Sequence, residues 1–168
     1  LKKIAPEATF IAGSVCTGET FFEELLKLGM LDFCDAVSFH AYNYNTGDST
    51  AEAWFARMQK LGALIRRYNR GADKPLYITE IGWPNHTTET GSTERESAAK
   101  LARLYLYARQ LPFIKGVWYY DFQDDGWKHG HHENNFGLVR PDLTPKTSYF
   151  ALKSLARRLS FGKPAGGE

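Results

Sequence analysis

One stretch of the chain decides its fold, the segment LYITEIGWP at residues 76–84. Its first six residues are rich in β-branched and aromatic side chains, which is typical of a buried strand, and Gly82-Trp83-Pro84 ends it. Glu80 is the exception, because a carboxylate in an apolar strand costs free energy unless it is paired or has a function. Strict alternation places Glu80 on the same face as Ile78. The stretch therefore predicts a strand whose carboxylate is either functional or bound by an arginine or a helix N-terminus.

Three further strand patterns and four helical patterns surround this segment. Runs of β-prone residues predict strands at 8–13, 35–41 and 114–120, and apolar spacing of three and four residues predicts helices at 19–28, 50–68, 93–111 and 145–159. Successive strands start about 27 to 40 residues apart, which fits right-handed parallel crossovers. We expect Thr17 to cap the first helix, and Thr93-Glu94-Arg95-Glu96 to form a capping box. The expected fold class is α/β with four βα units.

Two architectures accommodate four βα units, an open doubly wound sheet and part of a (β/α)8 barrel. No glycine-rich turn follows any of the expected strands, which argues against the nucleotide-binding form of the open sheet. A complete barrel needs about 250 residues. The chain has 168 residues, so it cannot be a whole barrel. We expect one half-barrel domain over residues 1–161, followed by a loose tail at 162–168.

Composition narrows the class of protein. The chain is 43% hydrophobic and 24% charged with a net charge of +2, which excludes a disordered chain. No apolar run approaches the roughly 18 residues of a membrane span, and the small net charge argues against a nucleic-acid binder. Two cysteines, Cys16 and Cys34, are too few for a disulfide scaffold, and two free buried thiols are favoured over one bridge. We therefore expect neither a membrane nor a nucleic acid as partner.

Unusual polar and aromatic residues follow three of the expected strands. They lie at 40–45 after the second strand, at 80–86 around the end of the third, and at 118–127 after the fourth. Parallel α/β folds bind ligands at this edge of the sheet. Aromatic rings stack on the apolar faces of sugars, while carboxylates and amides bind the hydroxyl groups. The pattern therefore indicates an oligosaccharide ligand.

The same segments resemble clan A glycoside hydrolases. The string at 77–84 resembles the seventh barrel strand of the clan, where the Glu is the catalytic nucleophile, and VSFHAY at 37–42 resembles the sixth. The string at 116–126 resembles the eighth strand, and the residues at 135–149 resemble the segment that closes the barrel. The chain is most similar to the group around family 39, which includes β-xylosidases, and to family 5. The resemblance implies the C-terminal half of a barrel, strands five to eight.

Roles for individual residues follow from this resemblance. Glu80 is expected to be the nucleophile of a retaining β-glycosidase, with His40 as a second catalytic residue. His40 and Tyr42 are expected to orient the nucleophile. The expected sugar-binding residues are Tyr42, Asn43, Trp83, Trp118, Tyr120 and Trp127. The loop HGHHE at 129–133 offers metal donors, but its spacing matches no standard zinc site. We therefore expect neither a metal nor another cofactor.

One part of the catalytic machinery is missing. Retaining glycosidases need two carboxyl groups about 5–5.5 Å apart, a nucleophile and an acid/base. In the clan, the acid/base is the Glu of an Asn-Glu pair on the fourth strand, and no Asn-Glu pair occurs in this sequence. Three explanations are open. The chain is a truncated half whose other half is absent or on another polypeptide, or it pairs with a second copy into an eight-stranded barrel, or one of its own carboxylates replaces the acid/base. The candidates for such a replacement are Glu133, Asp121, Asp124 and Glu19.

A homodimer is the favoured alternative, because an open four-stranded sheet leaves apolar side chains exposed to water and two edges unpaired.

The expected function is hydrolysis of β-xylosides, β-glucosides or β-glycans from plant or microbial polysaccharide fragments. The alternatives are a non-catalytic carbohydrate-binding half-barrel and a truncated fragment. Loss of hydrolysis in a Glu80→Gln variant would separate an enzyme from a binder.

Overall fold

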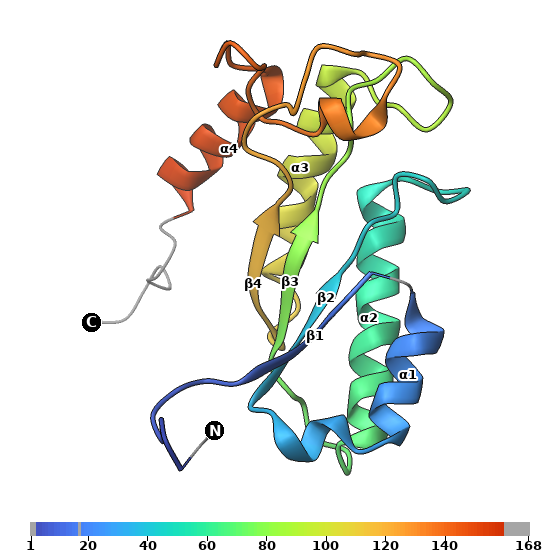
Figure 1. The fold of residues 1–168 in the computed structure, drawn as a ribbon, viewed down its shortest axis with the longest axis vertical. Helices are drawn as coiled ribbons and strands as arrows, with labels where there is room; N and C mark the ends of the chain where they lie inside the picture. Colours follow the sequence, from blue (N-terminus) through green and yellow to red (C-terminus); the bar gives the residue numbers. More distant parts are fainter. Residues whose placement is uncertain (1–2, 17, 160–168) are drawn as a thin grey trace. The chain divides into compact units, whose positions relative to one another are not determined.

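The computed structural model describes residues 3–16 and 18–159. Its helices and strands, in chain order, are β1 (Ile11–Val15), α1 (Glu19–Lys27), β2 (Ala36–His40), α2 (Ala51–Tyr68), β3 (Leu76–Ile81), α3 (Glu94–Ala108), β4 (Ile114–Tyr119) and α4 (Thr147–Arg158) (Figure 1). Two short 3-10 helices, η1 (Met30–Phe33) and η2 (His132–Asn135), were not expected. The fourfold alternation of strand and helix is confirmed. Thr17 and residues 162–168 lie outside the described residues.

The largest difference in boundaries concerns the first strand, which begins at Ile11 rather than at residue 8. The Phe10 N–H is bound by the Asp35 carboxylate at 2.8 Å, and the Phe10 carbonyl accepts the N–H groups of Asp35 and Ala36. A side chain therefore takes the place of a ladder partner here, and regular pairing starts one residue later, with Ile11 opposite Ala36.

The strands form one four-stranded parallel sheet in the order β1-β2-β3-β4. Each strand therefore lies beside the next one along the chain, as in a (β/α)8 barrel, and no strand order reverses as it does in a doubly wound sheet. The fold is α/β, with four βα units that make half of such a barrel. No helix among the described residues is long and apolar enough to cross a membrane.

The chain forms two compact units. The first unit comprises Leu1–Tyr42, Glu52–Ile81 and Tyr107–Trp118, and the second unit comprises Asn43–Ala51, Gly82–Leu106 and Tyr119–Glu168. The first unit contains β1, β2, β3, α1 and α2, whereas α4 belongs to the second. The expected single domain at 1–161 is therefore described below as these two units.

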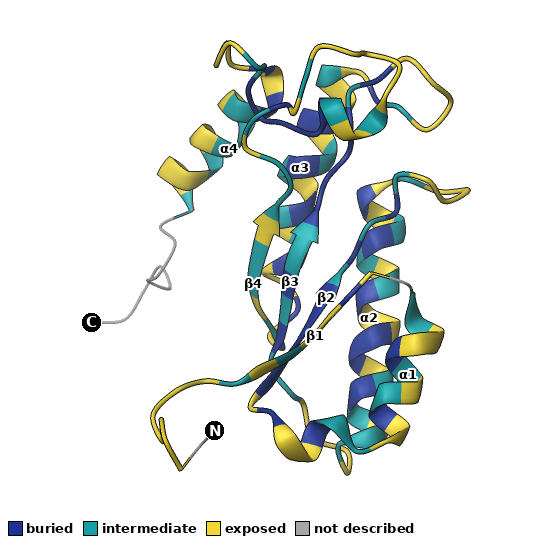
Figure 2. Ribbon diagram, viewed as in Figure 1, coloured by how far each residue is buried: buried dark blue, intermediate teal, exposed yellow. Residues whose placement is uncertain are grey.

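The core of the first unit lies between the strands and the inward faces of α1 and α2 (Figure 2). The Phe22 ring of α1 meets the Phe39 ring of β2 edge to face, with centroids 5.5 Å apart. The apolar stripe of α2 is buried at Trp54, Met58 and Ile65, in accord with the helical spacing of the sequence. Burial of these large side chains is the main source of the unit's stability.

A β-bulge interrupts the pairing of β2 with β3. Phe39 lies opposite Ile78, but the next residue, His40, lies opposite Glu80, so Thr79 is one residue too many for the register. Ile78 is fully buried whereas Glu80 is partly open, although strict alternation would place the two side chains on one face. The bulge breaks the strict alternation that placed them on one face, and it takes the carboxylate out of the apolar layer.

The second unit has its own core, which includes Trp83, Leu101 and Leu104. The predicted capping box at the start of α3 is confirmed. The Thr93 N–H donates to Glu96 Oε2 at 2.7 Å, and the Glu96 N–H donates to Thr93 Oγ1 at 3.2 Å. These reciprocal bonds satisfy helix N–H groups that have no partner within α3.

Candidate active site

Glu80 ends in a small polar cluster of the first unit. The Tyr42 hydroxyl donates a hydrogen bond of 2.9 Å to Glu80 Oε2, and His40 Nδ1 lies 3.2 Å from the same oxygen. No other side chain of the described residues forms a hydrogen bond or ion pair with the Glu80 carboxylate, so no arginine holds it. The Glu80 side chain is 36% exposed and that of His40 is 17% exposed. The carboxylate is therefore oriented through one oxygen and open at the other.

The ends of β2 and β3 bring these three side chains together. His40 lies directly opposite Glu80 in the sheet, and the Ala41 N–H donates to the Glu80 carbonyl at 3.0 Å. This hydrogen bond fixes the backbone between His40 and Tyr42. Neighbouring parallel strands that end in polar residues thus place those residues at one edge, as the sequence predicts. The structure brings together the expected nucleophile and both residues expected to orient it.

Sequence reasoning missed a fourth residue at this site, Arg57 of α2. Its Nη1 donates a hydrogen bond of 2.6 Å to the Tyr42 carbonyl, and its Nε contacts Glu19 Oε1 of α1. The sequence offers only a weak signal, because Arg57 is one position before the buried Met58 on the apolar side of α2. Arg57 is 15 positions from Tyr42 and 38 positions from Glu19, and contacts at such separations leave no local pattern in the sequence.

Trp118 also belongs to the first unit. It lies in β4, the strand beside β3, and is 53% exposed. Its ring is tilted against that of Tyr77 in β3, with centroids 6.0 Å apart. An exposed indole that is held by a neighbouring ring is suited to stack on a sugar. Of the six expected sugar-binding residues, Trp118 and Tyr42 are in the same unit as Glu80.

Two of the other expected sugar-binding residues are buried in the second unit. Trp83 is 0% exposed and Asn43 is 3% exposed. Trp83 Nε1 donates a hydrogen bond of 3.0 Å to Asn43 Oδ1, and Asn43 Nδ2 donates to the carbonyls of Asp48 and Thr50. Their polar atoms are thus used within the protein, and neither offers a surface for a sugar to stack on. The expectation of sugar contacts at Trp83 and Asn43 is therefore corrected to a supporting role in the loops.

The last two expected sugar-binding residues are in the second unit as well. Tyr120 is half-buried, and its ring lies edge to face against Phe136 with centroids 5.3 Å apart. Trp127 is 58% exposed. Trp127 is therefore accessible in the second unit, whereas Tyr120 is largely packed within it.

Asp124, one of the candidate acids, is committed to a buried network of the second unit. Lys146 Nζ donates to Asp124 Oδ1 at 2.7 Å, and the Gly137 N–H donates to the same oxygen at 2.7 Å. The side chains of Asp124 and Lys146 are 4% and 3% exposed. Burial raises the pKa of Asp124 and lowers the pKa of Lys146. A carboxyl group so enclosed cannot reach the leaving oxygen of a glycoside.

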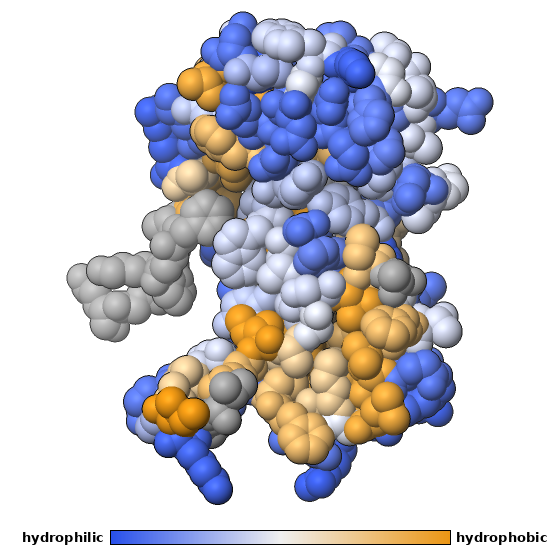
Figure 3. All heavy atoms as spheres, viewed as in Figure 1, coloured by the Kyte–Doolittle hydropathy of each residue, from blue (hydrophilic) through white to orange (hydrophobic). Residues whose placement is uncertain are grey.

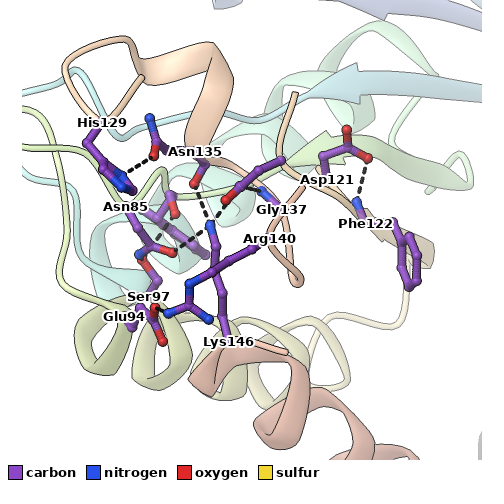
Figure 4. A network of polar contacts seen from close by, with 12 residues as sticks. Asn85, Glu94, Ser97, Asp121, Phe122, His129, Asn135, Gly137, Arg140 and Lys146 are labelled. Atoms are coloured by element: carbon purple, nitrogen blue, oxygen red, sulfur yellow. Dashed lines mark hydrogen bonds and ion pairs between the residues drawn. The ribbon is translucent and has the colours of Figure 1, made fainter. Parts of the chain in front are cut away.

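The same lysine binds two further groups in this network. Lys146 Nζ lies 3.3 Å from Asn85 Oδ1 and 3.2 Å from the Asn135 carbonyl (Figure 4). Asn85 Nδ2 in turn donates to Ser97 Oγ at 2.8 Å. Lys146 directly precedes α4. Its ammonium group thus connects the start of α4 with Asp124, with Asn135 of η2 and, through Asn85, with α3. The network is a structural centre, and its partners account for its buried charges.

The remaining candidate acids are either held in an ion pair or accessible. Glu19 is paired with Arg57, so it is committed to the first unit's helices. Asp121 accepts the N–H of its neighbour Phe122. Glu133 is exposed and lies 3.0 Å from His132 Nε2. Asp121 and Glu133 are accessible carboxyl groups of the second unit, whereas the sole accessible carboxylate in the His40–Tyr42 cluster is Glu80 itself.

Comparisons with known proteins identify the fold. No family model and no curated protein matches the chain, whereas solved structures do. A family 39 glycoside hydrolase from Bacteroides cellulosilyticus WH2 is 31% identical over 95% of this chain and 35% of its own length, with a TM-score of 0.72. A GH2 β-galacturonidase from Eisenbergiella tayi is 23% identical over 99% of this chain and 29% of its own, with a TM-score of 0.70.

A third structure, a GH5 protein from Streptomyces cattleya in complex with Manβ1-4GlcNAc, is 18% identical over 80% of this chain and 33% of its own, with a TM-score of 0.57. The chain spans about a third of the length of these structures. The neighbours include families 39 and 5, which the sequence resembles, and also family 2. The chain has a glycoside hydrolase fold.

Proposed function

We propose that the chain carries the nucleophile of a retaining β-glycosidase, and that the nucleophile is Glu80. The observation that carries the proposal is the environment of this carboxylate. Oε2 is held by Tyr42 and His40, while among the described residues no side chain forms a hydrogen bond or ion pair with Oε1. A nucleophile needs this combination, an orientation fixed through one oxygen and a second oxygen open to the substrate.

The reaction follows from this geometry. Glu80 Oε1 attacks the anomeric carbon of a β-glycoside, the bond from that carbon to the leaving oxygen breaks, and the electron pair goes to that oxygen. A separate acid supplies a proton to it. Water, activated by the same group as a base, then attacks the glycosyl ester, which releases the sugar and restores the Glu80 carboxylate. The Tyr42 hydroxyl stabilises the carboxylate's negative charge before substrate binds.

The substrate class rests on the aromatic residues and on the resemblance. Trp118 offers an exposed ring in the first unit for the face of a sugar. The resemblance of the sequence to family 39, which includes β-xylosidases, favours β-xylosides, with β-glucosides and β-glycans as related substrates. We therefore place the natural substrate among oligosaccharide fragments of plant or microbial polysaccharides.

The acid/base comes from outside the chain in this proposal, and a second copy of the chain completes the barrel. In the described sheet, β1 and β4 each have one neighbouring strand. Ile11 of β1 and Phe33 of η1 are exposed apolar side chains. Figure 3 shows apolar surface over β1, α1 and η1. An unpaired edge beside apolar surface favours association. Light scattering should give twice the 19.0 kDa of one chain, and a stable monomer contradicts this part of the proposal.

A substrate that needs no acid tests the nucleophile on its own. Dinitrophenolate is a good leaving group, so a 2,4-dinitrophenyl β-xyloside or β-glucoside reacts without protonation of the leaving oxygen. We expect the chain to release dinitrophenolate and Glu80→Gln not to do so. Glu89→Gln, which changes an exposed glutamate of the second unit, is the matched control and should keep the wild-type rate.

A non-catalytic carbohydrate binder is the second candidate, and the exposed indoles Trp118 and Trp127 favour it. A binder needs these rings but not Glu80. If wild type and Glu80→Gln bind xylo-oligosaccharides equally while neither releases dinitrophenolate, the binder is the better account.

A further inference from the structure

We infer that Arg57 is a positioning residue that sets the reactivity of Glu80 through Tyr42. The inference rests on the proposed function, because it concerns the same carboxylate. Arg57 touches neither the Glu80 carboxylate nor any predicted sugar-binding side chain, and its contact with Tyr42 is to the backbone. Its effect therefore has to pass through the position of Tyr42.

Tyr42 occupies a place where the sheet no longer holds the chain. β2 ends at His40, and the bond from the Ala41 N–H to the Glu80 carbonyl is the last one that the described residues make between these strand ends. Tyr42 is also the last residue of the first unit's opening segment. Its hydroxyl nevertheless has to meet Glu80 Oε2 at 2.9 Å. A group that binds the Tyr42 backbone therefore fixes the point from which this side chain starts.

The guanidinium of Arg57 supplies that group. Its Nη1 donates to the Tyr42 carbonyl at 2.6 Å, so a side chain of α2 binds the backbone just beyond the end of β2. The guanidinium carbon lies 5.3 Å from the centroid of the Phe39 ring. Phe39 precedes His40, so this contact places Arg57 along the end of β2. The side chain is only 23% exposed, which limits competition from water.

Glu19 of α1 orients the guanidinium from the other side. It accepts from Arg57 Nε while Nη1 binds the Tyr42 carbonyl, so the planar fork of donors is used in two directions at once. Burial alone would raise the pKa of Glu19, but the hydrogen bond and charge of Arg57 outweigh it and hold the pKa below its ordinary value. Glu19 is thus an anion at neutral pH, and the sequence Glu19–Arg57–Tyr42–Glu80 links α1 and α2 to the carboxylate.

A lysine cannot take over this role. Its ammonium group is a single point charge on a flexible stem, so it reaches Glu19 or the Tyr42 carbonyl but does not hold both in fixed geometry. We therefore expect Arg57→Lys to behave more like Arg57→Met than like the wild type. Arg67→Met, on the exposed face of the last turn of α2, is the matched control.

The first measurement is independent of catalysis. The chain is labelled with tyrosine that carries 13C at the ring carbon bonded to oxygen, and the Tyr42 signal is assigned by its loss in Tyr42→Phe. In Glu80→Gln the phenol faces an amide instead of a carboxylate, which gives the reference shift for a weakened contact. We expect Arg57→Met to move the Tyr42 signal in the same direction and Arg67→Met to leave it in place. An unmoved signal in a folded Arg57→Met variant overturns the inference.

The second measurement is the rate of covalent labelling by a 2-deoxy-2-fluoro-β-xyloside with a dinitrophenolate leaving group. Arg57→Met should lower the maximal labelling rate constant by about 10- to 100-fold, the range for a displaced reacting group, with little change in the inactivator concentration at half-maximal rate. In a Tyr42→Phe background the same change should have almost no further effect. Equal losses in both backgrounds, or labelling at the wild-type rate, overturn the inference, whereas a wild type that is never labelled overturns the proposed function as well.

Discussion

Two carboxylates near strand ends, Glu80 and Asp124, have opposite environments. Glu80 is the last residue but one of β3 in the first unit, is 36% exposed and is held through one oxygen by Tyr42 and His40. Asp124 follows β4 in the second unit, is 4% exposed and is bound by the Lys146 ammonium group and the Gly137 N–H. A carboxylate enclosed by such partners contributes to structure, whereas one that is oriented and left open is available for chemistry.

The local backbone explains the difference between the two. The bulge at Thr79 takes Glu80 out of the apolar layer, so its charge keeps contact with solvent. Asp124 instead lies where the segment after η2 returns, with the Asp124 N–H bound to the Val139 carbonyl. Residue type and position after a strand are thus similar at the two sites, and the chain's path around them decides the role.

The largest expected effect separates the two carboxylates by activity. Glu80→Gln should lower the rate of dinitrophenolate release by about 10⁴-fold or more, the scale of losing a nucleophile, because an amide does not form the glycosyl ester. Its free energy of unfolding should change by less than about 0.5 kcal/mol, as for other accessible positions. Enzyme assays and urea unfolding check the two parts. A Glu80→Gln variant that keeps activity, or one that barely folds, would contradict the contrast between a functional Glu80 and a structural Asp124.

The next largest expected effect concerns the buried pair of Asp124 and Lys146. Lys146→Met leaves Asp124 as an unpaired buried charge, which should cost about 3–5 kcal/mol of unfolding free energy. Adding Asp124→Leu removes that charge and should restore most of the loss, since apolar residues often replace a buried ion pair without cost. Urea unfolding of the single and double variants measures both. If the double variant is no more stable than Lys146→Met, the unpaired charge is not the cause.

A smaller effect concerns the capping box at the start of α3, in the second unit. Thr93→Ala removes the hydroxyl that accepts the Glu96 N–H, which should cost about 1 kcal/mol. Thr20→Ala, at an exposed position of α1, should change stability by less than about 0.5 kcal/mol. Thermal unfolding of the two variants beside wild type measures the difference. An equal effect at both positions would mean that the cap does not stabilise α3.

The smallest expected effect is a pH dependence of the first unit. Arg57 holds the pKa of Glu19 below its ordinary value of 4.5, so the pair stabilises the fold above that pH. This stability is lost as the pH falls through the lowered pKa of the folded state. The Tm of wild type should therefore drop more than that of Glu19→Gln between about pH 6 and about pH 3. Parallel curves for the two proteins would show that the ion pair does not contribute.

Most of the fold is predictable because apolar periodicity is local. The buried stripe of α2 and the extent of β3 follow from residue spacing alone. The cluster of Glu80 with His40 and Tyr42 is predictable for a related reason, because parallel strands bring their carboxyl ends to one edge. The resemblance to glycoside hydrolases then supplies the expected roles.

The features that sequence reasoning misses depend on non-local geometry. The bulge at Thr79 interrupts the alternation that would place Glu80 on one face with Ile78, and no residue type in the sequence indicates it. Trp83 and Asn43 have the composition of a sugar site, but they bind each other in the loops of the second unit and become buried. Arg57 reaches Tyr42 only once α2 has packed on the sheet.

Covalent trapping tests the central claim most directly. The chain is incubated with the 2,4-dinitrophenyl glycosides of 2-deoxy-2-fluoro-β-xylose and 2-deoxy-2-fluoro-β-glucose. It is then digested, and its peptides are analysed by mass spectrometry. The account predicts one fluorosugar on the peptide that contains Glu80, present in Glu89→Gln and absent in Glu80→Gln. A label on any other carboxylate, or an unlabelled chain with both reagents, contradicts it.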